Sequence, residues 1–190
     1  LSPGQNPRSA RLLEVSNSYD LIGLLNAYTG NWIDNIKNQL KNYREAEKYA
    51  KAAGDRGQIA YIHFHMGIAY MNEGKLDSAL MFIKKAISTF SDLKDQSGLG
   101  RAMKYLGDTY EKMGNFDLAA NTILQSISLL KETNDHLHLG LAYISLSRVF
   151  TGLEKNDSAL FYAKESLNIF EKRKDRAWKR DSYNLLSSYF

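Results

Sequence analysis

Apolar residues recur along this 190-residue chain at the spacing of one face of a helix. In the segment 77–90 they fall at i, i+4, i+7, i+8 and i+11, filled by Ala79, Ile83, Ala86, Ile87 and Phe90. Lysine and serine occupy the opposite side of the same helical wheel. This spacing predicts an amphipathic helix with one buried stripe. Such a helix needs a neighbour against which the stripe can be buried.

The same pattern returns after 40 residues and again after another 40. Its marker positions are Gly67, Gly107 and Ser147, each preceded by Met or Leu and followed three residues later by an aromatic residue. A fixed period indicates a stacked array, here of helix–turn–helix units. The predicted organisation is a tail at 1–10 followed by units at 11–55, 56–95, 96–135, 136–175 and a partial unit at 176–190.

Glycines and aspartates mark the predicted joints. Gly74 and Gly114 are suited to cap the first helix of their units. Aspartates stand in phase before the first helices and at the start of the second helices: Asp55, Asp95, Asp135 and Asp175, then Asp77, Asp117 and Asp157. We expect these carboxylates to accept hydrogen bonds from first-turn N–H groups and to complement the helix dipole, rather than to form catalytic pairs.

Small residues at the marker positions have a packing reason. Gly67 and Gly107 lie opposite Ala79 and Ala119 of the second helix, which predicts close approach of two antiparallel helices. Ser147 is expected to play the same part with a slightly larger group.

These residues resemble the tetratricopeptide repeat, whose consensus has Leu-Gly, then Tyr, then a later Ala. The clearest copy here is Leu106-Gly107, Tyr110 and Ala119. The resemblance covers nearly all of the chain after about residue 11 and implies an all-α, right-handed, superhelical solenoid of antiparallel helix hairpins. The family period is about 34 residues, so each helix here is expected to be longer by about three residues. Extended repeats of this kind look like those of bacterial peptide-sensing regulators and of sensor regions that precede kinase or DNA-binding modules.

The resemblance also implies a concave groove lined by the first helices, in which a protein or peptide ligand binds. The residues that carry over to groove positions are Tyr61, Phe64, Ile68, Met71, Arg101, Lys104, Asp108, Glu111, Leu141, Ile144 and Arg148. An apolar unit followed by a charged one would suit a ligand with hydrophobic anchors and an acidic group, with Arg101 and Lys104 as the cations. Tyr61, Phe64 and Ile68 have an alternative place, packed against the flanking helix of the longer first repeat. The family's carboxylate clamp is not reproduced, because Ile68 and Asp108 replace its asparagines.

Composition and residue spacing argue against several classes of function. The net charge is +4, but Lys and Arg alternate with Asp and Glu along the chain, which argues against nucleic-acid binding by this region. Cysteine is absent, and no apolar run is long enough to insert in a membrane. The histidines form pairs two residues apart, which is a poor spacing for shared metal ligation on a helix. No phosphate-binding glycine loop or nucleophile elbow is present, so we expect no catalytic residue, metal or other cofactor.

The sequence therefore predicts a non-catalytic protein- or peptide-binding scaffold, the sensing or interaction region of a larger bacterial signalling or regulatory protein. Two alternatives stay open: a self-contained peptide-responsive regulator, and a structural module that forms homo-oligomers through a terminal apolar face of Leu186, Tyr189 and Phe190. Leu1 is not a methionine, which is consistent with a removed signal peptide or with a fragment. Periplasmic and cytoplasmic locations are both compatible with this composition.

Overall fold

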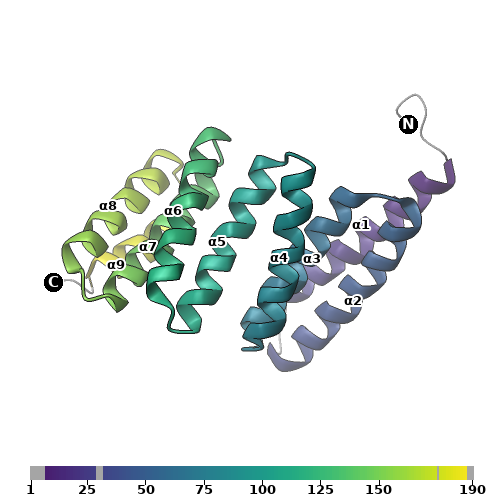
Figure 1. Ribbon diagram of the computed structural model, residues 1–190, viewed down its shortest axis with the longest axis horizontal. Helices are drawn as coiled ribbons and strands as arrows, with labels where there is room; N and C mark the ends of the chain where they lie inside the picture. The colour runs from purple at the N-terminus through teal and green to yellow at the C-terminus, as the bar shows by residue number, and fades with distance from the viewer. Residues whose placement is uncertain (1–6, 29–31, 175, 188–190) are drawn as a thin grey trace. The chain divides into compact units, whose positions relative to one another are not determined.

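The computed structural model describes residues 7–28, 32–174 and 176–187, and these residues form helices joined by short turns, without strands (Figure 1). The helices are α1 (Pro7–Tyr28), α2 (Trp32–Ala53), α3 (Arg56–Asn72), α4 (Leu76–Asp92), α5 (Gln96–Lys112), α6 (Phe116–Glu132), α7 (His136–Gly152), α8 (Asn156–Lys172) and α9 (Arg176–Ser187). We call α1, α3, α5, α7 and α9 the first helices of their repeats and the others the second helices. The predicted all-α array of helix hairpins is confirmed.

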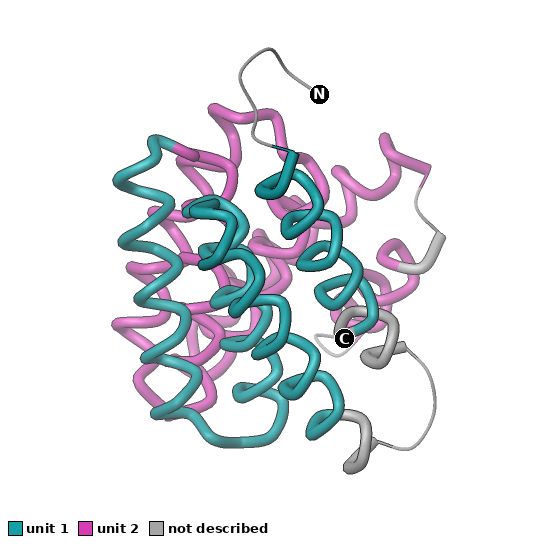
Figure 2. Tube along the Cα trace, turned by 90° about the vertical axis from the view of Figure 1, so that its right-hand side faces the viewer, with its two compact units in different colours: residues 1–94 teal, residues 95–190 magenta. Residues whose placement is uncertain are grey.

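Contacts divide the chain into two units, residues 1–94 and residues 95–190, coloured separately in Figure 2. In unit 1, α1 packs on α2, α3 packs on α4, and α2 contacts α3. In unit 2 the pairs are α5 with α6 and α7 with α8; α6 contacts α7, α5 contacts α7, and α9 packs on α8.

The helix α1 begins at Pro7, so residues 7–10, which the sequence-based organisation assigns to a tail, are helical. Proline favours this first position because its missing N–H has no helical partner there.

The turns repeat every 20 residues with one backbone conformation. Each has a residue with positive φ just after the helix: Gly54, Gly74, Lys94, Gly114, Asn134, Glu154 and Lys174. At Gly74 the amide N–H donates to the carbonyl of Met71 (3.2 Å), and the next amide, of Lys75, donates to that of Tyr70 (3.0 Å). This is the Schellman arrangement, which satisfies carbonyls at a helix end. The capping role predicted for Gly74 and Gly114 is confirmed, but lysine, asparagine and glutamate adopt the same conformation elsewhere.

The aspartates before the first helices cap them as predicted. The Asp55 carboxylate accepts a hydrogen bond from the Gln58 amide (2.7 Å), and Asp95 accepts one from Gly98 (2.8 Å). Asp135 accepts one from His138 (3.2 Å), while Asp175 lies outside the described residues. These bonds satisfy first-turn N–H groups that have no helical partner.

The aspartates of the second helices do not act as caps, which corrects the sequence-based expectation. The N-cap positions of α4, α6 and α8 are Lys75, Asn115 and Lys155, and none makes a side-chain cap hydrogen bond. The aspartates instead lie inside the first turn, at Asp77, Asp117 and Asp157. There they favour the helix through its dipole alone.

The marker residues bring the helices of each hairpin into close contact. A β-carbon built on Gly67 would lie 2.5 Å from Ile83 Cγ1 and 3.4 Å from the Ala79 carbonyl oxygen. Gly107 has the same relation to Ile123, and a β-carbon there would lie 3.3 Å from the Ala119 carbonyl oxygen. The predicted close approach is confirmed, and it leaves no room for a side chain without movement of an isoleucine.

Candidate functional site

The first helices of unit 2 contact each other along a line that we call the α5/α7 seam. On α5 the residues at spacings of three, four and three are Arg101, Lys104, Asp108 and Glu111; on α7 they are Leu141, Ile144 and Arg148. Spacings of three and four place side chains on one face of a helix. All seven are groove residues in the sequence-based expectation.

Arg148 joins the two helices of the seam. Its Nε donates to Glu111 Oε1 (3.0 Å) and its Nη2 donates to Oε2 (2.9 Å), which is a bidentate pair. Arg148 Nη2 also lies 3.7 Å from Asp108 Oδ1. Burial by itself would lower the pKa of Arg148, but the Glu111 hydrogen bonds and the charges of Glu111 and Asp108 raise that pKa above its ordinary value. The guanidinium is therefore a permanent cation with a fixed orientation.

Lys104 and Asp108 form a buried ion pair within α5. The distance from Lys104 Nζ to Asp108 Oδ2 is 2.7 Å, and both side chains are buried. The Lys104 ammonium also lies 4.1 Å from the centre of the Tyr105 ring. The sequence-based expectation for Lys104 is an exposed cation that meets an acidic ligand. In the structure its charge is used inside the molecule, because a buried ammonium needs a partner.

Arg101 reaches from α5 to the start of α7. Its Nε donates to Asp135 Oδ2 at 2.6 Å, and His138 Nδ1 lies 3.0 Å from each oxygen of the same carboxylate. Burial opposes ionisation of Asp135, but hydrogen bonds from His138 and Arg101 lower its pKa below the usual value. Burial also lowers the pKa of His138, although Asp135 acts in the other direction. One capping residue thus orients an arginine of the seam.

The apolar residues predicted for the groove lie in α3 of unit 1 and are less accessible than expected. Phe64 and Met71 are buried, whereas Tyr61 and Ile68 are partly buried. The Tyr61 ring packs edge-on against Phe90 of α4, with the ring centres 4.8 Å apart. This contact lies within the hairpin of α3 and α4, so it is not the packing against the longer first repeat that the sequence left as the alternative.

Polar contacts join the helices of unit 1 at residues that the sequence pattern does not single out. His65 Nδ1 lies 2.9 Å from Asp20 Oδ1, and Gln58 Nε2 donates to Asp20 Oδ2 (3.2 Å). His63 Nε2 lies 3.1 Å from Glu47 Oε1. Residues Asp20 and His65 are 45 positions apart, so only the register between repeats would have revealed the pair. Because His63 and His65 turn to different carboxylates, they do not converge on one point.

The carboxylate of Glu47 is stabilised in its charged form. Burial by itself would raise its pKa, but hydrogen bonds from Lys51 and His63 and the charges of both lower it. The Lys51 ammonium lies 2.6 Å from Glu47 Oε1. No group of three or more potential ligands suited to a metal ion occurs among the described residues.

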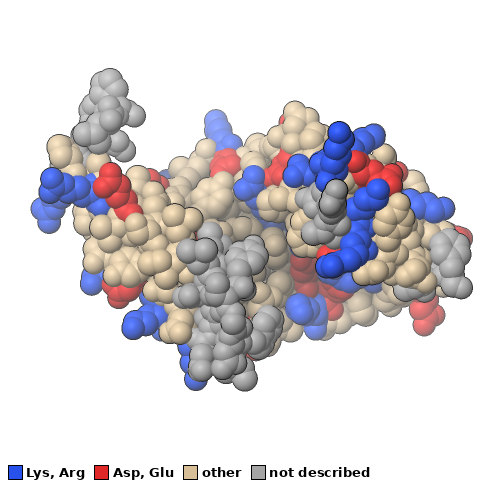
Figure 3. Space-filling view, turned by 180° about the vertical axis from the view of Figure 1, so that it is seen from behind, with Lys and Arg blue, Asp and Glu red and all other residues tan. Residues whose placement is uncertain are grey.

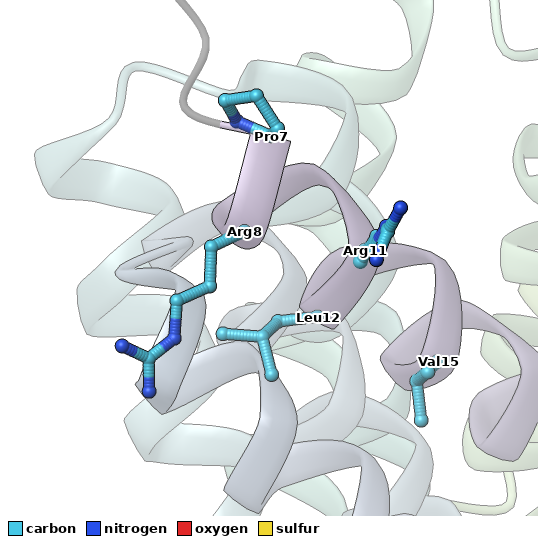
Figure 4. Close-up of a pocket in the computed structure, with 5 residues that line it drawn as sticks. All are labelled: Pro7, Arg8, Arg11, Leu12 and Val15. Atoms are coloured by element: carbon cyan, nitrogen blue, oxygen red, sulfur yellow. The ribbon is translucent and has the colours of Figure 1, made fainter.

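A pocket of about 400 Å³ lies at the first turns of α1. Its lining residues are Pro7, Arg8, Arg11, Leu12 and Val15, all from that one helix (Figure 4). It lacks the convergent polar groups from several elements that define a specific small-molecule site. We do not assign a function to it.

The charged residues are mixed in sign on the face of the molecule shown in Figure 3, where Lys and Arg lie among Asp and Glu. Within the part of the chain that the structure describes, none of the helices combines the length and apolar character required to span a bilayer.

Comparison with known proteins identifies the repeat. Residues 58–132 match the family model described as "Tetratricopeptide repeat". The search of curated proteins returned no match. Together with the helix hairpins and their spacing, the match shows that the fold is a tetratricopeptide-type solenoid. Repeats of this class build extended surfaces for binding other proteins.

Solved structures of the same architecture include three proteins with low sequence identity to this chain. Aspartyl phosphate phosphatase F from Bacillus subtilis has a TM-score of 0.78 at 17% identity, over 96% of this chain and 45% of that one. A signal-transduction ATPase with a tetratricopeptide repeat sensor, from Pyrococcus horikoshii, has a TM-score of 0.77 at 17% identity, over 96% of this chain and 28% of that one. The apo form of RapI has a TM-score of 0.72 at 16% identity, over 92% of this chain and 47% of that one. The present chain thus spans less than half the length of each of these proteins.

Proposed function

We propose that this chain is a non-catalytic scaffold that binds a protein or peptide segment on its first helices, as the sensing or interaction region of a larger bacterial signalling or regulatory protein. The observation that carries the proposal is the α5/α7 seam. There the side chains of two adjacent first helices are fixed by cross-helix ion pairs, while Arg148 stays substantially exposed. A rigid, partly exposed charged surface needs little ordering when a ligand binds.

The structural relatives support the signalling part of the proposal by fold only. The Pyrococcus protein is described as having a tetratricopeptide repeat sensor, and it is a much longer chain. The Bacillus protein is described as a phosphatase. We propose no reaction for the present chain, because Asp108, Glu111 and Asp135 in the seam are each engaged with a cation.

A peptide-display selection on the immobilised chain tests binding without prior choice of a ligand. Selected peptides are then measured against Ile144→Asp, in the seam, and Leu124→Asp, on the exposed side of α6 as a matched control. We expect Ile144→Asp to weaken binding at least about tenfold, since it replaces an apolar side chain of the contact surface with a charged one. Leu124→Asp should leave the affinity unchanged. Circular dichroism melts confirm that both variants are folded.

Two results would contradict the proposal: no selected peptide that binds in solution, or binding that Leu124→Asp abolishes and Ile144→Asp does not.

The oligomerisation alternative is tested by a separate measurement. Size-exclusion chromatography with light scattering should give the 21.6 kDa mass of a single chain. Twice that mass at micromolar concentration would favour the oligomer instead. The sequence predicts a terminal apolar face for this oligomer. In that face Leu186 is partly buried, whereas Tyr189 and Phe190 lie outside the described residues.

A further inference from the structure

The two ion pairs that join α5 to α7 in the seam are layered, with the arginines outside. The Arg148 side chain is 44% exposed, whereas its partners Glu111 and Asp108 are 18% and 6% exposed. At the other end of the seam, Arg101 is 32% exposed and its partner Asp135 is 10% exposed. The seam is close to neutral in formal charge, but the charge that a ligand meets first is positive. A mixed-sign sequence therefore produces a cationic contact surface.

Each of these arginines keeps donors for a ligand. Glu111 uses Nε and Nη2 of Arg148, so the Nη1 edge does not take part in that pair. Asp135 uses only Nε of Arg101. A guanidinium has five N–H donors in a fixed fork, and a carboxylate below it sets the direction of the remaining ones. Lys104 is different, since its ammonium is buried beside Asp108.

The two arginines lie at opposite ends of the seam. Glu111, which binds Arg148, lies ten positions after Arg101 on α5. Ten positions correspond to about 15 Å along a helix. On α7, the residues one and two turns before Arg148 are Ile144 and Leu141, and both are partly exposed apolar side chains. Apolar surface thus lies between two fixed cations. In an extended peptide, residues i, i+2 and i+4 point the same way and cover about 13 Å.

We propose that the α5/α7 seam binds an extended acidic segment whose two carboxylate side chains, four residues apart, pair with Arg101 and Arg148 while an apolar side chain midway packs on Leu141 and Ile144. This specifies the ligand chemistry of the site and rests on the proposed function. The reach of the glutamate and arginine side chains covers the small difference between the two spacings. Arg148 keeps its place in the complex because two carboxylates lie beneath it.

The layering predicts that the two residues of one ion pair affect ligand affinity differently. Removing the charge of Arg148 removes a ligand contact. Replacing Glu111 with glutamine keeps one acceptor oxygen beneath Arg148 and takes away a nearby negative charge that repels an acidic ligand. If the pair only joined α5 to α7, both changes would affect stability alone and would not differ in their effect on ligand affinity.

The experiment uses three fluorescein-labelled peptides, GESLSEG, GQSLSQG and GKSLSKG, titrated with the full chain and followed by fluorescence anisotropy. Arg148→Gln and Glu111→Gln are the matched variants, and their melting temperatures are measured in parallel. We expect the glutamate peptide to bind at least about tenfold tighter than the glutamine peptide, in line with charge-assisted hydrogen bonds. Arg148→Gln should remove about tenfold of that affinity, whereas Glu111→Gln should keep or increase it. Raising the salt concentration should weaken the glutamate peptide most.

The inference is overturned if the three peptides bind equally or not at all, if the lysine peptide binds tightest, or if Glu111→Gln weakens the glutamate peptide as much as Arg148→Gln does. These outcomes are separate from failure of the proposed function. Display-selected peptides without acidic residues that are still sensitive to Ile144→Asp would leave the scaffold proposal intact and remove only the acidic chemistry.

Discussion

The Ser147 hydroxyl donates a 2.8 Å hydrogen bond to the carbonyl oxygen of Ala159, across the contact between α7 and α8. In the two preceding repeats this marker position is a glycine, and the equivalent carbonyls of Ala79 and Ala119 approach the place of its missing side chain. Serine fits here because the position of Ile83 and Ile123 in those repeats is occupied by the smaller Ala163 in this one, and the serine hydroxyl donates to the carbonyl that it meets. The marker position fixes how closely the two helices of a hairpin approach.

Substitution of Gly107 tests this close approach. In Gly107→Ala the new methyl group would overlap with the Ile123 side chain, so we expect a loss of about 1–3 kcal/mol in the free energy of unfolding. Gly57→Ala is the matched control, since a β-carbon there would lie 3.4 Å from its nearest neighbour. The control should be neutral or stabilising by up to about 1 kcal/mol. Chemical denaturation measures the free energy of unfolding of both variants. An equal value for Gly107→Ala and wild type would exclude the assigned helix contact.

The repeated turn conformation predicts a stabilising substitution. Glu154 has φ of 58° at the position where Gly74 and Gly114 stand in other repeats. A non-glycine residue in this region carries a steric cost of about 1 kcal/mol. Glu154→Gly should therefore raise the free energy of unfolding by up to that amount, and Gly114→Ala should lower it similarly. Glu154→Ala separates the backbone effect from loss of the charge: stabilisation by alanine equal to that by glycine would contradict the account.

Removal of one partner of the buried pair on α5 should be costly. Lys104→Met leaves the buried Asp108 carboxylate with only the more distant Arg148, 3.7 Å away, and we expect a loss of about 3 kcal/mol. Adding Asp108→Leu to the same chain should recover most of it, because two apolar side chains then replace two buried charges. Urea denaturation of the single and double variants checks this. If Lys104→Met unfolds like the wild type, the lysine is not buried as described.

Asp135 and His138 should make the free energy of unfolding depend on pH in two separate ranges. The folded pKa of His138 lies below its ordinary value of 6.5, so the stability it contributes is complete above that pH and is lost as the pH falls through the folded value. The folded pKa of Asp135 lies below 3.8, so its contribution is complete above that pH and is lost at more acidic pH. We expect the melting temperature of His138→Asn to fall less than that of wild type between pH 7 and pH 5.

Asp135→Asn provides the control for the lower window. It should be less stable than the wild type at neutral pH, and this difference should shrink below pH 4, where the wild-type carboxyl also becomes protonated. A constant difference across the whole pH range would show that Asp135 acts only through the geometry of the cap.

The fold could be predicted because its determinants are periodic in the sequence. Gly67 and Gly107 mark the close contacts, Asp95 caps a helix through its own neighbours, and Gly74 adopts a conformation that glycine favours. Lys94 and Glu154 share that turn conformation without any local signal. In their case the array imposes the conformation on residues that do not prefer it.

The site was predictable only as a set of positions. The family resemblance implied groove positions for Arg101, Lys104 and Arg148, but it did not show which charges are paired inside the molecule. Lys104 meets Asp108 one turn along its own helix, whereas Arg148 meets Glu111 of another helix, 37 positions away. The distinction between a buried pair and an exposed arginine depends on the register between repeats, and a single repeat does not contain it.

The most direct test of the central claim is a map of the backbone amides that respond when a display-selected peptide is added to the ¹⁵N-labelled chain. The account predicts NMR chemical-shift changes concentrated on α5 and α7, with Arg101, Ile144 and Arg148 among the most affected residues. Changes confined to the second helices α6 and α8, with α5 and α7 unaltered, would contradict it.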